Sequence, residues 1–315
     1  MAVVNQAQLE IANINFANLM RLMLQQQDSR LQGTCQTGTH TGSKQAAPIE
    51  YLAPTQFTAA MPRGSDLPSK YSNLQRRWVS PTPFENWVDV DSFDELLYMD
   101  SPKSLIPANF QAAANRKKDD VIIQAFFADA KIGPVGAQTT EVFDSGADFP
   151  ISVSIADTVG AGSATGLNIE KLLNAQEILG LYENAEGATL HLGMTPRSLR
   201  DLMGTVEFTS TDFRRNATYD ELGRPTSFMG FQMHYSNRWA YNPADSDERW
   251  LPVWIQDGMH LGTWQEVETH IDPLPTKTGR PWRCYAMMTL GATRLQAGQV
   301  VRIAVLDTNG GPITP

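Results

Sequence analysis

Cysteine, long apolar runs and excess positive charge are all scarce in this sequence. Its 315 residues include only Cys35 and Cys284, which lie far apart and outside any CxxC spacing. Neither a disulfide framework nor a thiolate metal site is therefore indicated. No apolar run approaches the roughly 20 residues that span a bilayer, and the N-terminus has no secretory signal pattern. These absences predict a protein that is made and kept in the cytosol.

The balance of charge is acidic. With 34 acidic and 25 basic residues, the formal net charge is -9. This argues against a protein whose main task is to grip a phosphate backbone. The alternative is that the acidic excess only keeps the chain soluble, and both interpretations stay open. A hydrophobic share of 42% and a charged share of 19% are otherwise those of a globular protein with a full-sized core.

Three features come close to motifs for chemistry, and each fails on a definite point. GTHTGSK at 38–44 has the wrong spacing for a phosphate-binding loop and no apolar strand before it. Gly160, Gly162 and Gly166 suggest a dinucleotide loop, but the next strand ends in MTP where an acidic residue should hold the ribose. The five histidines contain no HExxH and no pair at helical ligand spacing, so we interpret each as donating a single hydrogen bond. We predict no catalytic, cofactor-binding or metal-binding residue.

The first hundred residues lack the means to build a core of their own. Residues 9–27 carry apolar side chains, Phe16 and Leu19 among them, at the spacing of a helix with one apolar face. The polar run at 32–45 has no periodicity and indicates an extended arm. Prolines are frequent between 48 and 100, where short alternations flank RGSDLPS and predict a long two-stranded excursion.

About 70 residues of arm and hairpin therefore call for a partner surface, because structureless connections beyond about 12 to 15 residues are uncommon in compact domains. An enzyme with a large lid and a disordered tail is the alternative that this pattern leaves open.

The rest of the chain mixes helices and strands without a repeating βα rhythm. A glycine-free, alanine-rich stretch at 107–130 predicts a helix of six or seven turns, with a solvated charged face at 116–120. Asn168 and Gly180 are placed to begin and end a second helix, and Thr195, Pro196 and Gly204 punctuate a third. Residues 230–307 are largely of β type. The predicted class is α+β.

This order of elements resembles the major capsid proteins of tailed phages with the Hong Kong 97-like fold. Four blocks carry the resemblance: DDVIIQAFFADAKIG at 119–133, LHLGMTPRSLRDLMG at 190–204, GRPTSFMGFQMHYSN at 223–237 and LGATRLQAGQVVRIAVLD at 290–307. Together they span nearly the whole chain. The resemblance implies a structural protein that self-assembles into the icosahedral head around double-stranded DNA, and not an enzyme.

The resemblance also implies a division of the chain. Residues 1–48 would be the N-arm, 49–100 the E-loop, 101–164 the peripheral domain with its spine helix and 165–285 mainly the axial domain, whereas 286–315 would return to the peripheral domain. Contacts between subunits are expected from Phe16 and Leu19 in the arm and from Arg76, Arg77 and Trp78, which carry charge and aromatic surface beside each other. For the last three, a solvated strand face is the alternative.

The implied partners are other copies of the chain, as pentamers and hexamers. A separate scaffolding protein is expected because the chain has no room for the cleaved scaffolding segment that some family members carry. A portal and a decoration protein are further expected partners. The shell would enclose DNA without tight sequence-specific binding, with no cofactor and no membrane, and would be a virion component made in the host bacterial cytoplasm. An encapsulin-like compartment shell, or an oxidoreductase using the 160–166 loop, are the alternatives.

Overall fold

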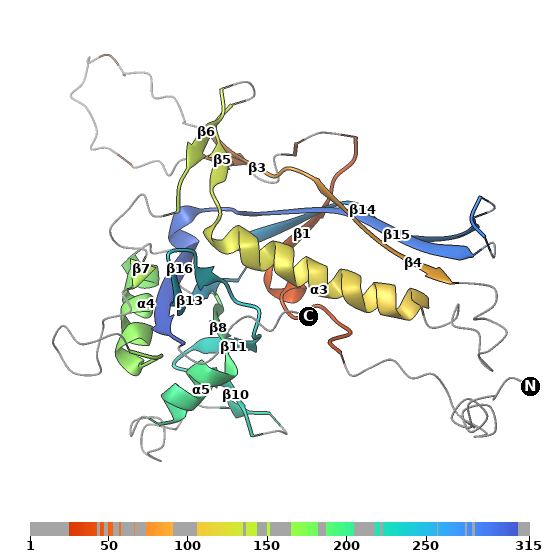
Figure 1. The fold of residues 1–315 in the computed structure, drawn as a ribbon. Helices are drawn as coiled ribbons and strands as arrows, with labels where there is room; N and C mark the ends of the chain where they lie inside the picture. The colour runs from red at the N-terminus through yellow and green to blue at the C-terminus, as the bar shows by residue number, and fades with distance from the viewer. Residues whose placement is uncertain are drawn as a thin grey trace, which may run out of the picture. The chain divides into compact units, whose positions relative to one another are not determined.

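The computed structural model describes the greater part of the chain, which Figure 1 colours from its N-terminus to its C-terminus. The described residues are 25–42, 45–46, 50–52, 57, 66, 74–90, 106–134, 137–143, 150–151, 165–181, 187–204, 218–220, 223–256, 258–274, 276–278 and 281–307. They divide into two compact units. The smaller unit takes its described residues from within 25–28, 84–116 and 266–288, and the larger one from within 29–83, 117–265 and 289–307.

The larger unit is built on an eight-stranded mixed sheet in the order β7-β16-β13-β8-β11-β10-β9, with β12 paired to β13. Its strands are β7 (Pro150–Ile151), β8 (Leu190–Met194), β9 (Thr218–Tyr219), β10 (Pro225–Phe228), β11 (Phe231–Tyr235), β12 (Tyr241–Asn242), β13 (Asp245–Ile255) and β16 (Val300–Leu306). Strands β8 and β11 are parallel, whereas β13 is antiparallel to both β8 and β16. This mixed sheet, together with the helices, confirms the α+β class.

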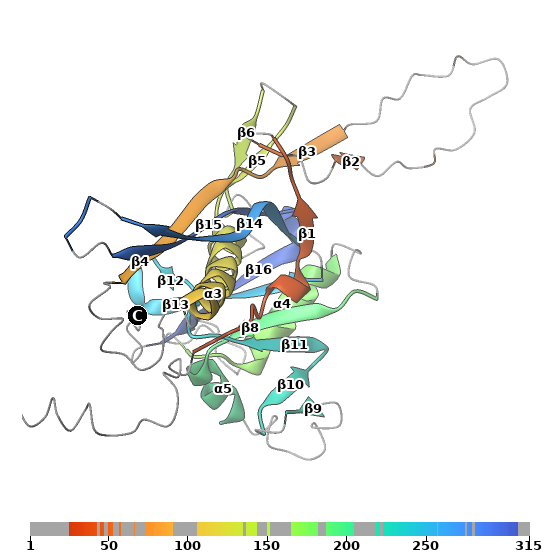
Figure 2. The same cartoon turned by 90° about the vertical axis from the view of Figure 1, so that its right-hand side faces the viewer.

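Two helices of the larger unit begin where their capping residues predict. In α4 (Ile169–Leu181) the Asn168 side chain accepts a hydrogen bond from the Lys171 backbone at 3.0 Å, although the helix runs one residue past the expected stop at Gly180. In α5 (Pro196–Met203) Thr195 accepts from the Ser198 backbone. Both caps satisfy donors that the first helical turn leaves free. Helix α4 contacts β16 and β7, and α5 lies beside β10 and β11 in Figures 1 and 2.

Aromatic and aliphatic side chains fill the core of the larger unit. The Phe126 and Trp254 rings lie 4.8 Å apart between centroids, and Trp239 packs against both rings at 6.3 Å. All three side chains are buried, together with the inward residues of β8, β13 and β16. Tight packing of this kind, with aromatic rings tilted toward one another, is typical of a self-sufficient domain core.

Several positive charges are also buried in this unit, and the two most completely buried, Arg249 and Lys171, are each matched by acceptors. The Arg249 Nε lies 2.9 Å from the Asp307 carboxylate, and both side chains are at most 6% exposed. Lys171 donates to the carbonyls of Thr165, Gly166 and Ala304 at 2.9 to 3.1 Å. A buried charge without partners is very costly, so these contacts have to be kept in the folded chain. They tie Ala304 on β16 to Lys171 on α4, and Asp307, just after β16, to Arg249 on β13.

Two smaller sheets complete the strand pairing. One has the order β2-β3-β5-β6, formed by β2 (Glu50–Leu52), β3 (Leu74–Trp78), β5 (Ala130–Ile132) and β6 (Thr139–Glu141). The other has the order β1-β14-β15-β4, formed by β1 (Gln36–Thr39), β14 (Met259–Pro273), β15 (Trp282–Arg294) and β4 (Thr82–Val90). In the smaller unit, Phe110, Cys284 and Ala286 form a small core of their own.

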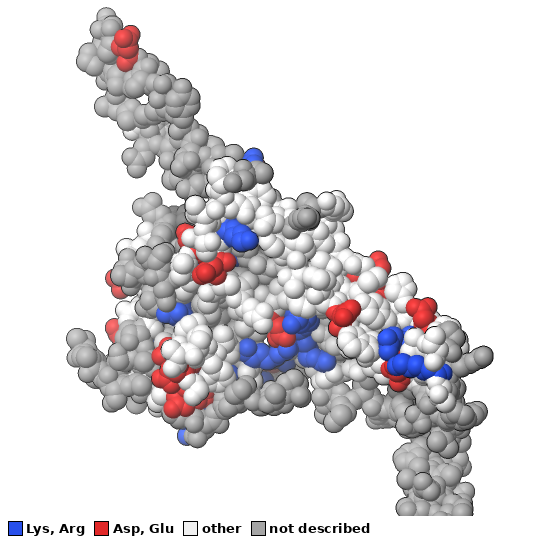
Figure 3. All heavy atoms as spheres, turned by 45° about the horizontal axis from the view of Figure 1, so that its top comes forward, with Lys and Arg blue, Asp and Glu red and all other residues white. Residues whose placement is uncertain are grey.

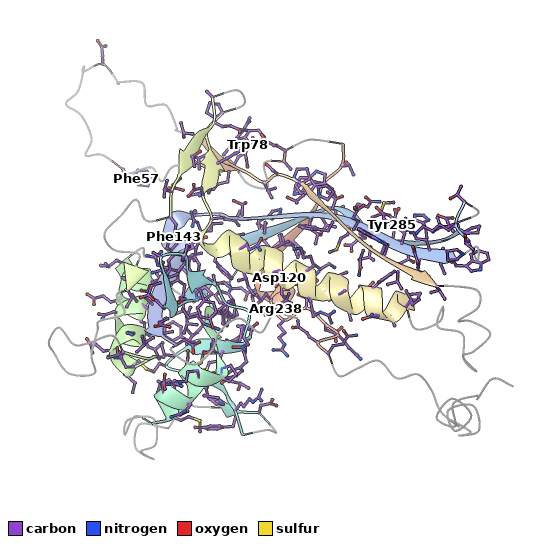
Figure 4. All side chains as sticks on the ribbon, viewed as in Figure 1. Phe57, Trp78, Asp120, Phe143, Arg238 and Tyr285 are labelled. Atoms are coloured by element: carbon purple, nitrogen blue, oxygen red, sulfur yellow. The ribbon has the colours of Figure 1, made fainter. Side chains whose placement is uncertain are left out.

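The long helix is confirmed, but the prediction of a solvated charged face on it is wrong. Helix α3 spans Ile106–Phe127, 22 residues. Lys118 and Asp119 are buried, and the neighbouring charged residues 116, 117 and 120 are only partly exposed. Asp120 pairs with Arg238, as Figure 4 shows, and not simply with solvent. Local charge patterning suggested a surface because the partners that cover this stretch lie far away in the sequence.

Candidate assembly surfaces

The residues expected to contact neighbouring subunits fall in two places. Phe16 and Leu19 lie outside the described residues. Arg76, Arg77 and Trp78 lie on β3, where each side chain has a partner within the chain: Arg76 with Glu50 at 2.5 Å, Arg77 with Glu141, and Trp78 through its Nε1 with the Gly133 carbonyl at 2.8 Å. Arg77 is buried, whereas Arg76 and Trp78 keep part of their surface exposed.

The base of the arm is held by one carboxylate that the sequence did not single out. Asp119, buried on α3, accepts from the backbone N–H groups of Arg30 and Leu31 at 3.1 to 3.2 Å and from the Ser29 hydroxyl at 2.5 Å. A carboxylate that collects several donors is a strong acceptor site. The start of the 3-10 turn η1 (Gln32–Thr34) is thereby anchored to residues about 90 positions later in the chain.

After η1 the arm continues as β1, which is a strand of the sheet β1-β14-β15-β4. Strand β1 pairs in parallel with β14, from Gln36 opposite His260 to Thr39 opposite Thr263. The His40 backbone N–H then donates to the Thr263 carbonyl at 2.9 Å. The polar run at 32–45, expected to be an extended arm without a local partner, is therefore a β-strand over part of its length.

Four of the five histidines meet in two pairs, which corrects the expectation of isolated rings. His40 Nε2 and His260 Nε2 are 3.0 Å apart, and His191 Nδ1 is 3.0 Å from His234 Nε2. Burial and, after it, the partner imidazole together lower the pKa of both His234 and His260 to about 4. These residues are separated by 43 and 220 positions in the sequence, so no local spacing could have revealed the pairs.

In the smaller unit, β4 is the last strand of its sheet and presents an edge. Asp89 on this strand binds Arg283 at 2.7 Å and Lys277 at 3.0 Å, and Glu85 accepts from the Tyr285 hydroxyl at 2.7 Å. The hydrogen bonds from Arg283 and Lys277 hold the pKa of Asp89 well below its usual range. These side chains bind the strand to β15, while its outer edge has no strand partner among the described residues.

Large apolar side chains are exposed on the segments that were expected to reach a neighbour. Phe57 is fully exposed, and Trp87 and Val88 on β4 are exposed by 52% and 40%. Single exposed apolar residues are ordinary, but Trp87 and Val88 follow each other on β4 and so point to opposite faces of the sheet beside its open edge, which gives two apolar positions for a neighbour to cover.

The charged side chains do not form a broad phosphate-binding face on the side drawn in Figure 3, where lysines and arginines gather in small groups with acidic side chains beside them. Within the described ranges, no group of three or more histidine, cysteine or acidic side chains is arranged to hold a metal ion. None of the described helices is both long enough and apolar enough to cross a membrane.

Comparison with known proteins gives a consistent set of matches. The family model described as "Phage capsid protein" matches residues 10–307. Among solved structures, the capsid of the cyanophage P-SCSP1u is 11% identical, covers 93% of this chain and 92% of its own and has a TM-score of 0.66. The capsid of cyanophage Pam1 is 12% identical, with coverages of 92% and 95% and a TM-score of 0.62.

The head of the Helicobacter pylori bacteriophage KHP40 is 12% identical to this chain, with coverages of 93% and 99% and a TM-score of 0.59. No curated protein matches the sequence. At such low identity the structures establish the fold, which is the Hong Kong 97-like capsid fold, while the family model covers nearly the whole chain. The chain therefore belongs to the phage capsid protein family and is a major capsid protein, the structural protein of an icosahedral bacteriophage head.

Proposed function

We propose that this capsid protein acts without catalysis and fastens to neighbouring copies through the arm before residue 25 and the E-loop at 49–100. The observation that carries this proposal is the exposure of Phe57, Trp87 and Val88, all within 49–100, while the core of the larger unit is closed. Apolar surface of this kind is stabilised when a partner covers it. A shell of many weak repeated contacts is cooperative, because the apolar surface of each subunit is covered only when its neighbours are in place.

We retain Phe16, Leu19, Arg76, Arg77 and Trp78 as contact residues, with different roles. Phe16 and Leu19 would supply the apolar face of the arm. Arg76 and Trp78 are half-buried and can still meet a neighbour, whereas Arg77, paired with Glu141, would position β3. The roles of 1–48 as N-arm, 101–164 with 286–315 as peripheral domain and 165–285 as mainly axial domain stay predictions. Strand β16 lies within 286–315, and it is paired with β13 in the eight-stranded sheet.

The finer partners also stay predictions. They are pentamers and hexamers of this chain, a separate scaffolding protein, a portal and a decoration protein, with production in the host bacterial cytoplasm. The comparisons favour neither an encapsulin-like compartment nor an oxidoreductase. Particles that contained a cargo enzyme in place of genome would point to the compartment.

Negative-stain microscopy of particles formed in the presence of the phage's other head proteins tests the proposal. Changing Phe16 and Leu19 to Asp, or Trp87 to Asp, should leave folded soluble subunits and remove particles, because a charge cannot be buried cheaply in an apolar contact. Matched controls add the same charge at neighbouring polar positions: Asn15→Asp with Asn18→Asp in the arm, and Asn86→Asp on β4.

The controls should form normal particles. Normal particles from both apolar-to-Asp variants would contradict the proposal, and so would loss of particles that accompanies loss of the native circular dichroism spectrum.

A further inference from the structure

The arm strand β1 is short and is attached at its end by a pair of histidines. β1 contributes four residues to the ladder with β14, and His40 follows directly after it. Gln36, Gly38 and His40 share one face of the arm, opposite His260, Gly262 and Trp264 on β14. The His40 ring lies against Trp264, with 5.0 Å between ring centroids, and its Nε2 meets that of His260.

Two glycines make this diagonal contact sterically feasible. A Cβ atom on Gly38 would lie 2.8 Å from the His260 ring, and one on Gly262 would lie 2.9 Å from the His40 ring. Any other residue at either position would push an imidazole aside. The GTH sequence at 38–40, which fails as part of a phosphate loop, thus has a structural use in the arm.

The surroundings determine how the two rings share protons. The Nδ1 atom of His260 is buried and has no hydrogen-bond partner among the described residues. Because a buried N–H group without an acceptor is costly, the neutral pair is best arranged with the His260 proton on Nε2, which donates to His40 Nε2. A first added proton can keep this bond as an imidazolium that donates to a neutral imidazole, but every such arrangement places an N–H group on the buried Nδ1 of His260, and a second proton places two N–H groups face to face.

Among the described residues, no charged group contributes to the pKa of either ring. Burial and His40 account for the lowered pKa of His260, and burial alone lowers that of His40. The described groups that lie against the pair include the neutral Trp264 ring on β14 and the backbone of Gly38 on β1 and Gly262 on β14. No carboxylate contributes to either pKa. Acid therefore disrupts this contact and does not strengthen it.

We propose that the His40–His260 pair is an acid-sensitive latch, which holds β1 on β14 when both rings are neutral and releases the strand when the pair is protonated. The state of this latch is set by the binding of protons to the two rings. Asp119 binds the arm at Arg30 and Leu31, which come before η1, and this attachment is separate from the histidine pair. The release therefore concerns residues 33–40 and leaves the base of the arm attached. Because the folded pKa values lie below the ordinary 6.5, the latch is complete above that pH and weakens as the pH falls toward about 4.

The chain carries its own reporter for this movement. Cys35 is buried in the arm immediately before β1, whereas Cys284 is buried in the smaller unit. The experiment follows the reaction of both thiols with 4,4′-dithiodipyridine in the purified full chain between pH 7.5 and 4.5. Rates are normalised at each pH to a small free thiol. We expect the normalised reactivity of Cys35 to rise by about tenfold or more as the pH falls, and that of Cys284 to stay constant.

Two glutamine variants separate the latch from general acid effects. His40→Gln keeps an acceptor for His260 without a titrating nitrogen, so exposure of Cys35 should shift to lower pH. His270→Gln changes an exposed histidine on β14 and should behave like the wild type. Exposure of Cys35 at pH 7.5 in His40→Gln would show that loss of the ring, and not protonation, frees the strand, and would overturn the proposal.

The proposal is overturned if Cys35 stays protected at pH 4.5, if both cysteines react together, or if His270→Gln changes the profile as much as His40→Gln. None of these outcomes depends on whether particles form, so the latch and the proposed assembly contacts can fail independently.

Discussion

The two units of this capsid protein differ in how much of their stability each can supply alone. The larger unit encloses Phe126, Trp239 and Trp254 and buries the Arg249–Asp307 pair. Among its described residues, the smaller unit has one core cluster of three buried residues with two partly buried neighbours, and most residues of its strand β4 are exposed. A small core leaves little margin over the entropy of ordering the chain.

This difference suggests how one chain serves both folding and assembly. The larger unit has a closed core that lets it reach a unique structure before assembly, although Phe57 and other apolar side chains on it stay exposed. The smaller unit exposes apolar side chains such as Trp87 on the strand that forms the open edge, which a neighbour in the shell can cover. Mutations in the core of the larger unit should therefore act on subunit stability, whereas mutations of exposed apolar side chains should act on local order or particle formation.

The largest effect is expected from Asp307→Ala in the larger unit. Removing the carboxylate leaves Arg249 buried without its ionic partner, so the free energy of unfolding should fall by about 3 to 5 kcal/mol. Urea unfolding of the soluble subunit, followed by tryptophan fluorescence, measures the change. Asp247→Ala is the matched control, since this exposed aspartate lies on β13 next to the same site. The free energy of unfolding of this variant should lie within about 0.5 kcal/mol of the wild-type value. An equal loss in both variants would break the comparison.

A smaller effect is expected at the N-terminus of α5. Thr195→Ala removes the hydroxyl that accepts from the Ser198 backbone and should cost about 1 kcal/mol. Thr195→Ser keeps the oxygen and should restore most of that loss. The same urea titration tests both. If serine were as destabilising as alanine, packing of the threonine methyl group and not the cap would explain the effect.

The caps of α4 and α5 also show what could be predicted from the sequence. Asn168, Thr195 and Pro196 act on neighbours within three residues, so their meaning is readable locally, and the structure confirms it. The long helix and the closing strand were predictable for the same reason, since periodicity is a local property. The conjunction of four blocks along the chain then identified the family.

The contacts that hold the arm could not be predicted in this way. Asp119 was interpreted as part of a solvated face, and His40 and His260 as isolated rings. Their partners lie between 88 and 220 residues away, and a residue carries no local mark of a distant partner. The glycines at 38 and 262 were a weak signal, because each permits close approach of a ring, but only the register of β1 on β14 explains them.

The smallest expected effect concerns Asp89 in the smaller unit. Asp89→Asn removes the charge that binds Arg283 and Lys277 at the surface. Exposed ion pairs contribute little to global stability, so the free energy of unfolding should not change measurably. The backbone amides of β4 and β15 should nevertheless exchange with deuterium faster, because these side chains bind one strand to the next and local opening needs less free energy than global unfolding. Glu268→Gln, an exposed acid on β14, should leave the exchange of β4 unchanged. Asp89→Asn could instead lower the free energy of unfolding as much as Asp307→Ala does. The smaller unit would then contribute to global stability as the larger one does, and the open edge of β4 could not be explained as a surface that a neighbour covers.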